Sequence, residues 1–577
     1  MLSKRWEVAP PLPTDQLDFL PGYSDILKRI VYNRGFTNYD SAIRFLNPLS
    51  TNWNDPSNLL GISQAVERIQ WGIQKGEKIA VYGDYDADGV TATALLTQLL
   101  RSLGADVMSY IPNRFDEGYG LNVDALDNLN ENDIKLVITV DCGIRSNEEA
   151  KHAKDIGLDL IITDHHHPIS ELPESFAIIN PKQENDPYPY KELSGVGIAF
   201  KLAVALLINK WPGIVINSFE YLPQELASYL DLVAIGSVAD LVPLTGENRA
   251  LVRLGLSQIR KPHRPGLYSL IKISGLTVNR ISSADIGYIL GPRLNASGRL
   301  DTALTSLRLL LTEDRNEAGL LAQELEMQNR KRQDITREIF NSVTERLASP
   351  KDQEALLLVA VDSSFNPGVI GLVASRLTEK FYRPAIVASS DGSYIRGSCR
   401  SIHEFHITNA LDKCAELMEH HGGHAAAAGF TIRNELFPEL IKRLRCIAEK
   451  ELSNLDLRPV LKADAEVAFS ELEEELIDEL DLLQPTGHGN PAAYLVTRDL
   501  IVEWKRTVGK DNTHLKLGLF DGKRRFNAIA FNLGHWYDLL PSGSRIDALY
   551  TFEMNEFDGY YFPQLNVKDI KTAGSKD

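Results

Sequence analysis

The chain has 577 residues, which is too long for a single hydrophobic core, so we expect three or four domains. Its 44% hydrophobic and 24% charged residues are ordinary for a globular protein. No apolar stretch reaches the roughly 20 residues of a membrane span, because the best candidate, 230–244, contains Asp231 and Asp240. The N-terminus lacks the apolar segment of an export signal. The four cysteines have no CxxC spacing, which argues against a zinc knuckle or a disulfide framework and favours a reducing, cytoplasmic compartment.

The net charge of −17 is unfavourable for a protein that binds nucleic acid, since phosphate contacts are normally made by a basic surface. It does not exclude such a partner. Binding needs only a local basic groove, and bound metal cations add positive charge that the sequence count omits.

We expect an N-terminal helical extension over 1–65. Between residues 78 and 182, short apolar strands alternate with helical patterns. Helices are predicted over 89–104 and near 146–156, and the predicted strands cover 78–83, 105–112, 134–141, 158–164 and 176–182. Nearly continuous Val, Ile and Leu strands separated by amphipathic helices are typical of a parallel sheet covered on both faces. We expect this α/β domain to span 66–310, with mostly helical structure after residue 195.

One long helix is predicted next, because 315–348 contains no Gly or Pro after Gly319. It would be about 30 residues long, or roughly 45 Å at about 1.5 Å per residue. Its polar faces favour a connecting helix between domains, which we place at 311–348. A second α/β domain is expected over 349–456, and the strand-rich tail over 457–577 favours a small β-barrel.

Acidic and imidazole side chains follow the predicted strands of the first domain. The strand 78–83 is followed by "DYDADG", the strand 134–140 by Asp141, and the strand 158–163 by "DHHH". A further acid, Asp240, ends an otherwise apolar helical stretch. Ligands of open parallel sheets bind outside the carboxyl ends of the strands, so these side chains are expected to converge.

Clustered carboxylates repel one another, at a cost on the order of 4 kcal/mol for each pair about 4 Å apart at an effective dielectric constant near 20. Basic residues are scarce in these segments, and carboxylate–imidazole sets are typical ligands of Mn²⁺ or Mg²⁺. The alternative is that the aspartates cap the helices that follow their strands. The convergence of several strand ends with a His-His pair favours a site for two divalent metal ions, bridged by one aspartate.

These segments resemble the successive motifs of the DHH phosphoesterase superfamily: "GDYDADG" (83–89), "VDCG" (140–143), "TDHH" (163–166) and "SVADLVPL" (237–244). Further segments resemble the RecJ-type family of single-strand-specific exonucleases. They are "PNRFDEGYGLN" (112–122), "SGVGIAFKL" (194–202), "GPRLNASGRL" (291–300), "NPGVIGLVASRL" (366–377), "RGSCRSI" (396–402) and "GGHAAAAGF" (422–430). The resemblance covers about residues 70–560, and it implies a DHH phosphoesterase domain, a DHH-associated substrate-binding domain and a C-terminal oligonucleotide-binding (OB) barrel.

The resemblance also implies roles for individual residues. The metal ligands fall on Asp86, Asp88, Asp141, His165 and Asp240. Asp141 is expected to bridge the two ions, and His166 is expected to face the substrate phosphate. These two are the predicted catalytic residues. Supporting hydrogen bonds are expected from Asp84 and Asp164, and a solvated turn position for His167. Tyr82 stands where many superfamily members have a histidine ligand, so we expect water to complete one site.

Substrate contacts are implied for Arg114 and Arg293, and for a set in the second domain that suits a terminal phosphate: Arg396, Ser398, Arg400, Ser401, Gly422, Gly423 and His424. The alanines at 425–428 favour a helix behind this binding loop. In the barrel, basic residues interleave with an aromatic one, as single strands require: Trp504, Lys505, Arg506, Lys523 and Arg525.

Three functions remain open. The leading one is a monomeric, cytoplasmic exonuclease that degrades single-stranded DNA from the 5′ end and releases mononucleotides in DNA repair and recombination. A helicase or a single-strand-binding protein would be its partner, and no membrane would be involved. The second is a phosphodiesterase for short oligoribonucleotides or cyclic dinucleotides, which chain length, connecting helix and barrel disfavour. The third is a non-catalytic replication scaffold, which the intact acid and imidazole set disfavours.

Overall fold

The computed structural model describes all residues except 1–2, 51–52, 114–116, 119, 211–215, 217, 348–354 and 575–577. The chain divides into two compact units. One comprises Val8–Met327 together with Ala463–Lys576, and the other comprises Met1–Glu7 with Gln328–Lys462. Among the described residues, every helix is too short or too polar to cross a membrane.

The first unit contains the predicted parallel sheet, in the order β3-β2-β4-β5-β6. Its strands are β2 (Lys78–Gly83), β3 (Asp106–Tyr110), β4 (Ile134–Val140), β5 (Asp159–Thr163) and β6 (Ala177–Ile179). Val81 lies beside Ile138 of β4, and Ile138 lies beside Ile161 of β5. The carboxyl ends of β2, β4 and β5 therefore reach the same edge of the sheet.

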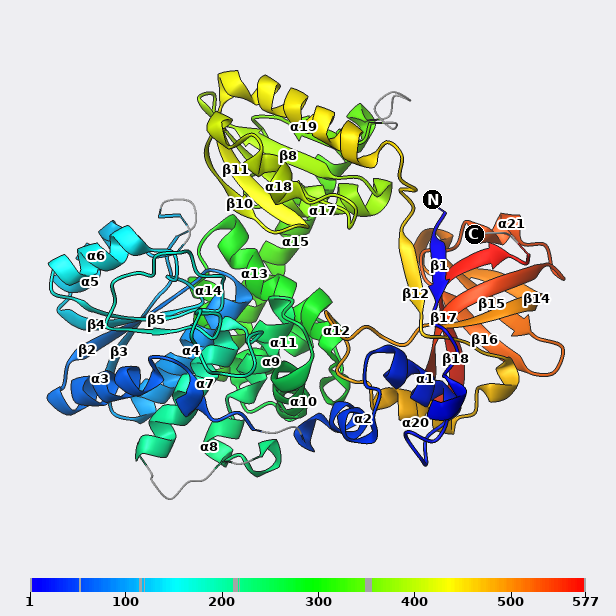
Figure 1. Ribbon diagram of the computed structural model, residues 1–577, viewed down its shortest axis with the longest axis horizontal. Helices are drawn as coiled ribbons and strands as arrows, with labels where there is room; N and C mark the ends of the chain where they lie inside the picture. The colour runs from blue at the N-terminus through cyan, green and yellow to red at the C-terminus, as the bar shows by residue number, and fades with distance from the viewer. Residues whose placement is uncertain are drawn as a thin grey trace. The chain divides into compact units, whose positions relative to one another are not determined.

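Helices cover both faces of this sheet, as its apolar strands predict (Figure 1). On one face, Ile79 and Val81 share a core with α3 (Ile62–Lys75), α4 (Ala87–Ser102) and α7 (Gly195–Lys210). On the other face, Ala80 and Tyr82 pack against α5 (Val123–Glu131) and α6 (Asn147–Asp155). The alternation follows from the side-chain period of two along a strand.

Helices continue the first unit from residue 224. They are α8 (Gln224–Ala227), α9 (Leu230–Ala239), α10 (Gly246–Ile259), α11 (Pro265–Ile273), α12 (Ser283–Asp285), the π-helix η6 (Ile286–Leu290), α13 (Gly291–Leu300) and α14 (Leu304–Leu311). The apolar α9 is buried along almost its whole length and ends at Asp240, its C-cap residue. The long helix α15 (Arg315–Arg346) has 32 residues, as the sequence predicts, and its first half packs on this helical core.

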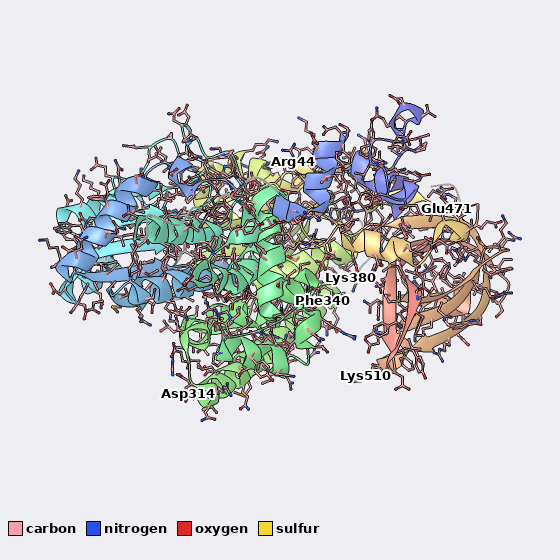
Figure 2. The ribbon with its side chains drawn as sticks, turned by 90° about the horizontal axis from the view of Figure 1, so that it is seen from below. Arg44, Asp314, Phe340, Lys380, Glu471 and Lys510 are labelled. Carbon is pink, nitrogen blue, oxygen red and sulfur yellow. The ribbon has the colours of Figure 1, made fainter. Side chains whose placement is uncertain are left out.

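The second unit contains a five-stranded sheet in the order β10-β11-β9-β8-β7, in which only β7 and β8 are parallel. Its strands are β7 (Leu358–Val361), β8 (Ala385–Ser390), β9 (Tyr394–Arg400), β10 (Met418–Gly423) and β11 (Ala427–Arg433). One face packs on α18 (Ile407–Asp412) and α19 (Phe437–Leu452), and α17 (Ile370–Phe381) contacts β8 and β9. In the same unit, Lys380 Nζ of α17 lies 5.3 Å from the ring centre of Phe340 in α15; both residues are labelled in Figure 2.

The predicted helix over the alanines at 425–428 is wrong. Ala425 and Ala426 form a tight turn between β10 and β11, Ala427 and Ala428 begin β11, and the amide of His424 donates to the carbonyl of Ala427 over 2.7 Å. The high helix propensity of alanine is a weak preference, and the ladder that β11 forms with both β9 and β10 overrides it.

The C-terminal part of the first unit is a closed barrel in the order β13-β14-β15-β16-β18-β17, in which β14 also pairs with β17. Its strands are β13 (Ala465–Glu466), β14 (Leu495–Val508), β15 (His514–Phe520), β16 (Arg525–Ala530), β17 (Arg545–Phe557) and β18 (Tyr560–Thr572). The short α20 (Glu475–Asp481) and α21 (Trp536–Leu539) accompany them. In the second unit, β1 (Arg5–Val8) pairs with β12 (Val460–Ala463), and the last residue of each strand falls in the first unit. The turn signals at 521–523 and 557–561 mark two of the barrel's hairpins, as predicted.

The two N-terminal helices belong to the core of this barrel. Leu27 and Ile30 of α1 (Asp25–Asn33) and Phe45 of α2 (Tyr39–Leu46) share one buried cluster with Leu517 and Ile546. The beginning of the chain therefore folds against its C-terminal domain.

The barrel is joined to the helical core through the segment 482–490. The amide of Leu244 donates to the carbonyl of His488 over 2.7 Å, and Ser283 Oγ donates to the carbonyl of Thr486 over 2.6 Å. The buried guanidinium of Arg249 donates to the carbonyl of Leu482 over 2.7 Å. Leu244 lies four residues after Asp240, so the barrel contacts the segment that follows this predicted metal ligand.

Candidate metal centre

The loop after β2 presents its aspartates through local hydrogen bonds. Asp86 is the N-cap of α4, and its Oδ1 accepts from the amides of Asp88 at 2.9 Å and Gly89 at 3.1 Å. The carboxylate of Asp88 accepts from two amides at the start of α7, Gly195 at 2.7 Å and Val196 at 2.9 Å. The capping alternative is thus realised at Asp86, and Asp88 is instead held by a helix that begins more than 100 residues later.

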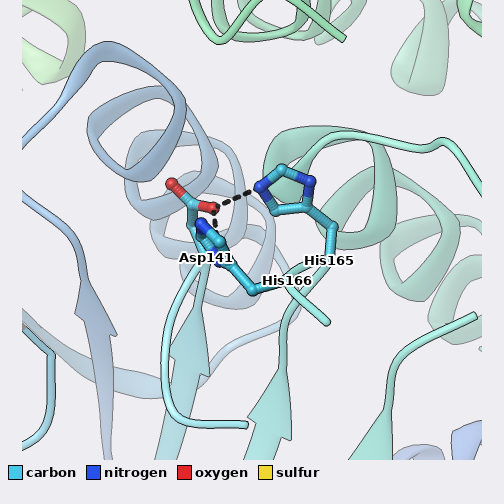
Figure 3. A group of neighbouring side chains, drawn as sticks. All are labelled: Asp141, His165 and His166. Carbon is cyan, nitrogen blue, oxygen red and sulfur yellow. Dashed lines mark ion pairs between the residues drawn. The ribbon is translucent and has the colours of Figure 1, made fainter. Parts of the chain in front are cut away.

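Asp141 and the two histidines lie at the ends of the two neighbouring strands (Figure 3). Asp141 is 2% exposed and has a φ of 64°, a left-handed conformation that aspartate tolerates better than most residues. His165 Nε2 lies 3.0 Å from Asp141 Oδ1 and 3.4 Å from Asp240 Oδ2. It is also 4.0 Å from Asp88 Oδ2, so one imidazole nitrogen approaches three carboxylates.

Three groups of potential ligand atoms each lie within 4.8 Å of one another. They are Asp84, Asp86 and Asp141; Asp88, His165 and Asp240; and Asp141, His165 and His166. Asp141 therefore lies near the ligands of two neighbouring positions. The structure brings together all five residues that the sequence predicts as ligands.

The buried donor atoms of this centre fit a metal ion. Asp141 Oδ1 and His165 Nε2 are both buried, and neither makes a hydrogen bond within the described part of the chain. Leaving buried polar atoms without a partner costs about 1–3 kcal/mol each. A divalent cation between them would satisfy both, and oxygen and imidazole donors are the set that Mn²⁺ accepts.

The carboxylates raise one another's affinity for protons. Burial, followed by the charges of the neighbouring aspartates, raises the pKa of Asp141 and Asp240 well above the usual value and that of Asp88 to about 7. Burial also lowers the pKa of His165 to about 3, so this imidazole is neutral at pH 7 and can act as a ligand. Bound cations would reverse the carboxylate shifts by favouring the charged form.

His166 is oriented by the residue two positions before it. Its Nδ1 lies 2.7 Å from Asp164 Oδ1, and its amide donates to the same oxygen over 3.0 Å. Burial raises the pKa of Asp164, but the hydrogen bonds and charge of His166 bring it down to about 2. His167 is exposed, and its carbonyl accepts from Arg145 Nε at 3.0 Å.

Tyr82 points away from the centre, into the face of the sheet that α5 and α6 cover. Its hydroxyl donates to the carbonyl of Gly120 over 2.9 Å and accepts from Asn122. Asp84, for which the sequence suggested only a supporting role, instead lies in one of the three ligand groups, with Asp86 and Asp141.

The motif 291–300 supports the acidic loop, a role that sequence analysis missed. Asn295 Oδ1 accepts from the amide of Ala87 at 2.7 Å, and a Cβ at Gly298 would lie 2.5 Å from the carbonyl oxygen of Tyr85. Arg293 pairs with Glu326 at 2.8 Å. The segment 291–300 could be found in the sequence only by its resemblance to a family motif, because the spacing of its polar residues is not that of metal ligands.

The strand β9 presents the predicted phosphate-binding residues on one side. Arg396, Ser398 and Arg400 alternate with buried residues along the strand, and Arg400 Nη1 donates to Ser398 Oγ over 3.3 Å and to the carbonyl of Cys399 over 2.8 Å. Burial lowers the pKa of Arg400, and within the described part of the chain no carboxylate lies within ion-pair distance of it. A half-buried guanidinium without an acid partner is suited to an anionic ligand.

The remaining residues of this predicted pocket lie nearby in the same sheet. Gly422 of β10 pairs with Gly429 of β11, which pairs with Ser398 of β9. Gly423 and His424 follow at the turn, while the hydroxyl of Ser401 donates to the carbonyl of Phe405 over 2.6 Å and so serves the loop after β9. The predicted contact residue Arg114 lies outside the described residues.

On the barrel, the structure separates the predicted nucleic-acid contacts. Trp504 and Arg506 line a groove of about 460 Å³ with other basic, aromatic and polar side chains: Lys516, Asn527, Phe557, Phe562 and Gln564. Arg525 lines an adjoining groove and pairs with Glu503 at 2.9 Å. Lys505 points elsewhere, with its amino group over the ring of Tyr537, and Lys523 lies in the exposed turn before β16.

Three family models match the chain: the DHH family N-terminal domain over 78–237, the DHHA1 domain over 354–450 and the RecJ OB domain over 463–569. The single-stranded-DNA-specific exonuclease RecJ of Bacillus subtilis is 40% identical, with 99% of this chain and 71% of the relative covered. The Escherichia coli RecJ is 34% identical, covering 94% and 95%. The crystal structure of Thermus thermophilus RecJ with Mn²⁺ matches with a TM-score of 0.83 at 29% identity, over 99% of this chain and 80% of that one.

A parallel sheet with acids and histidines at its carboxyl edge, followed by a second α/β domain, defines a DHH-type phosphoesterase. The barrel and the near-complete alignments narrow this class further. The chain belongs to the RecJ family.

Proposed function

We propose that this chain is a metal-dependent exonuclease that hydrolyses single-stranded DNA in the 5′→3′ direction and releases mononucleotides, in DNA repair and recombination. The observation that carries the proposal is the buried cluster in which His165 Nε2 approaches Asp141 and Asp240 within 3.4 Å. Relatives up to 40% identical bear the name single-stranded-DNA-specific exonuclease.

The ligands of two divalent cations, Mn²⁺ or Mg²⁺, would be Asp86, Asp88, Asp141, His165 and Asp240, with Asp141 shared. Asp84 is a further candidate beside Asp86, because Tyr82 provides no donor there. When bound, such ions supply positive charge to the phosphodiester and acidify water.

The chain's own residues would orient the scissile phosphate. Asp164 fixes the ring of His166 through Nδ1, and we propose that the other ring nitrogen donates a hydrogen bond to a non-bridging phosphate oxygen. Negative charge develops on these oxygens in the transition state, so a donor held in place before the reaction stabilises that state more than the ground state.

The proposed 5′→3′ polarity rests on β9. No carboxylate among the described residues pairs with the half-buried Arg400 beside Ser398, and this guanidinium would bind the terminal 5′ phosphate with Arg396 and the Gly422–His424 turn. Arg293 is already paired with Glu326, so a substrate contact there would require this ion pair to open or share its guanidinium.

The barrel groove is the proposed path of the remaining strand. Trp504, Phe557 and Phe562 offer aromatic surface for bases, and Arg506 and Lys516 offer charge for phosphates. Such a groove favours a strand longer than a dinucleotide. Binding through such a local basic surface would be compatible with the net charge of −17.

We also propose domain boundaries that differ slightly from those predicted from the sequence. Helix α3 begins at Ile62 and packs in the phosphoesterase core, so this domain would start before Ile62 rather than after residue 65. The preceding extension would form one folding unit with the barrel. The connecting helix would correspond to α15, Arg315–Arg346, rather than to 311–348, and the second domain keeps its proposed limits. We propose a cytoplasmic monomer recruited by a helicase or a single-strand-binding protein.

One assay tests the proposal. End-labelled single-stranded DNA, duplex DNA and RNA dinucleotides are incubated with Mn²⁺, Mg²⁺ or EDTA. We expect stepwise loss of mononucleotides from the 5′ end of the single strand alone, and no hydrolysis in EDTA. Preferential cleavage of the dinucleotides would favour the small-substrate phosphodiesterase, and inactivity with every metal would favour the scaffold.

A further inference from the structure

The first turn of α7, together with Ser194 just before it, contacts two of the proposed metal ligands. The amides of Gly195 and Val196 donate to the two oxygens of Asp88 at 2.7 and 2.9 Å. A Cβ at Gly195 would lie 2.6 Å from the Cβ of Asp141 and 2.8 Å from its Oδ1. Real Cβ atoms do not come this close to other atoms, so Asp141 occupies space that exists only because residue 195 has no side chain.

Further contacts fix the place of this turn. Ser194 Oγ accepts from the amide of Gly197 at 3.1 Å and lies 2.8 Å from Ser237 Oγ of α9, three residues before Asp240. On the same helix α9, a Cβ at Gly236 would lie 2.7 Å from Asp88 Oδ1. Asp88 therefore lies between the start of α7, which contacts Asp141, and the last turn of α9, which precedes Asp240.

A buried ion pair holds α7 further along its length. Lys201 is fully buried, and its Nζ lies 2.7 Å from Glu247 Oε1 of α10 and 2.9 Å from the carbonyl of Asn54. The hydroxyl of Tyr188 donates to the other oxygen of Glu247 over 2.6 Å. Trp53 lies under the same ammonium at 3.6 Å from its ring centre. These contacts fix the position of α7 against α10 and against the segment before α3.

We propose that Gly195 is a positioning residue of the metal centre: the first turn of α7 sets the separation between Asp88 and Asp141 and thereby the affinity of the site that they share. The inference rests on the proposed metal centre. It assigns a role to the motif "SGVGIAFKL" (194–202), for which the sequence predicts no metal ligand. Holding the two carboxylates before any cation arrives removes part of their mutual repulsion from the cost of binding.

The test is Gly195→Ala in the full-length chain, with Mn²⁺ binding measured by isothermal titration calorimetry. Because alanine favours a helix over glycine, helix propensity alone predicts an equal or more stable protein. We expect instead that Mn²⁺ affinity falls at least tenfold, because Asp141 must move away from the added methyl group, and that this overpacking also lowers the melting temperature without metal. The rise in melting temperature on adding Mn²⁺ shrinks accordingly.

Two matched glycines serve as controls. Gly319→Ala adds the same methyl group to α15, where nothing lies within 4 Å, and should leave Mn²⁺ affinity unchanged. Gly197→Ala lies on α7 itself, but its Cβ would meet Ser194 Oγ at 3.2 Å rather than a ligand. Wild-type Mn²⁺ affinity in Gly195→Ala would overturn the inference, and so would equal losses in Gly197→Ala.

Two further arms keep the result decisive. If Gly195→Ala does not fold, Ser194→Ala decides, because it only removes atoms: weaker Mn²⁺ binding by the folded variant supports the inference, and unchanged binding overturns it. Asp141→Ala separates this inference from the proposed function. If the wild type binds no Mn²⁺, or Asp141→Ala binds it equally well, the metal centre itself is misplaced.

Discussion

Asp141 combines more constraints than any other residue of the proposed site. It is 2% exposed, adopts a φ of 64° and lies 3.0 Å from His165. An alanine there loses the carboxylate and also fits the left-handed backbone less well than aspartate or asparagine. The functional and the conformational effects can therefore be separated by two substitutions at one position.

We predict that Asp141→Ala lowers kcat on single-stranded DNA to less than about a tenth, a barrier change above roughly 1.4 kcal/mol. Asp141→Asn should lose as much activity while keeping the wild-type melting temperature, because asparagine accepts the backbone conformation. Steady-state kinetics and thermal melting measure the two effects. Activity near wild type in either variant would exclude Asp141 as the shared ligand.

The histidine run gives a prediction with an internal control. His166→Ala removes the side chain that Asp164 orients at 2.7 Å, and we expect kcat to fall by about 10²–10³, as for the loss of a transition-state donor. His167→Ala should change kcat less than twofold, because this side chain is exposed. If the two effects were reversed, the roles assigned along the run would be shifted by one residue.

Arg400→Ala tests the proposed grip on the 5′ end. Charge-assisted hydrogen bonds contribute about 1.5–3 kcal/mol, so kcat/KM on 5′-phosphorylated strands should fall roughly ten- to a hundredfold. Strands with a 5′ hydroxyl lack that contact and should be affected much less. Oligonucleotides that differ only at this end provide the comparison, and equal losses on both would assign Arg400 a structural role in its sheet.

At the scale of elements, the strand β14 carries both a predicted contact and its control. Trp504 lies opposite Gly518 of β15, where the absence of a side chain leaves space for the indole ring. Trp504→Ala should weaken binding of long single-stranded DNA by about 1–3 kcal/mol for each base it stacks. Lys505→Ala, on the neighbouring position, should have little effect, because its amino group lies over Tyr537. Fluorescence anisotropy over a range of salt concentrations measures both, and similar losses would place the strand elsewhere on the barrel.

The elements also show what could be predicted from the sequence. The parallel sheet, the 32-residue α15 and the barrel were predictable, because each has a strong periodic or apolar pattern. The convergence of Asp86, Asp141 and His165 followed from the rule for strand ends. The β-hairpin of β10 and β11 was not predicted, since the alanines at 425–428 favour a helix locally, whereas pairing with the neighbouring strands determines the structure. The contact between Asp88 and the amides of α7 could not be predicted from the sequence, because almost every residue type offers the same backbone donor.

At the scale of the whole molecule, Arg249 links parts of the chain that are far apart in sequence. Its guanidinium, 1% exposed, donates to the carbonyls of Phe45, Leu482 and Gln484 and lies 4.2 Å from the ring centre of Phe45. It therefore joins the helical core, the N-terminal helix α2 and the barrel. Deleting the barrel would uncover all these groups, so single barrel variants test DNA binding more cleanly than truncation does.

We predict that Arg249→Ala destabilises the protein by several kcal/mol, since each buried carbonyl left without a donor costs about 1–3 kcal/mol. Chemical denaturation followed by circular dichroism should show a lower midpoint and an earlier, separate transition of the barrel. Arg253→Ala, one turn later on α10, is the control, because among the described residues its guanidinium makes only one hydrogen bond, to the carbonyl of Leu46 at 3.4 Å. Equal denaturation midpoints for the two variants would show that Arg249 does not join the domains.

The position of α1 and α2 in the barrel core has a consequence during synthesis. Leu27 and Phe45 are made early, but their partners Leu517 and Ile546 come more than 450 residues later. At about 5–20 residues per second, a ribosome needs roughly 20–90 s to supply them. Throughout this time two amphipathic helices expose their apolar faces while the phosphoesterase domain folds behind them. The nascent chain should thus be a substrate for chaperones that bind apolar segments near the ribosome, and its N-terminus should be the last part to become protease-resistant.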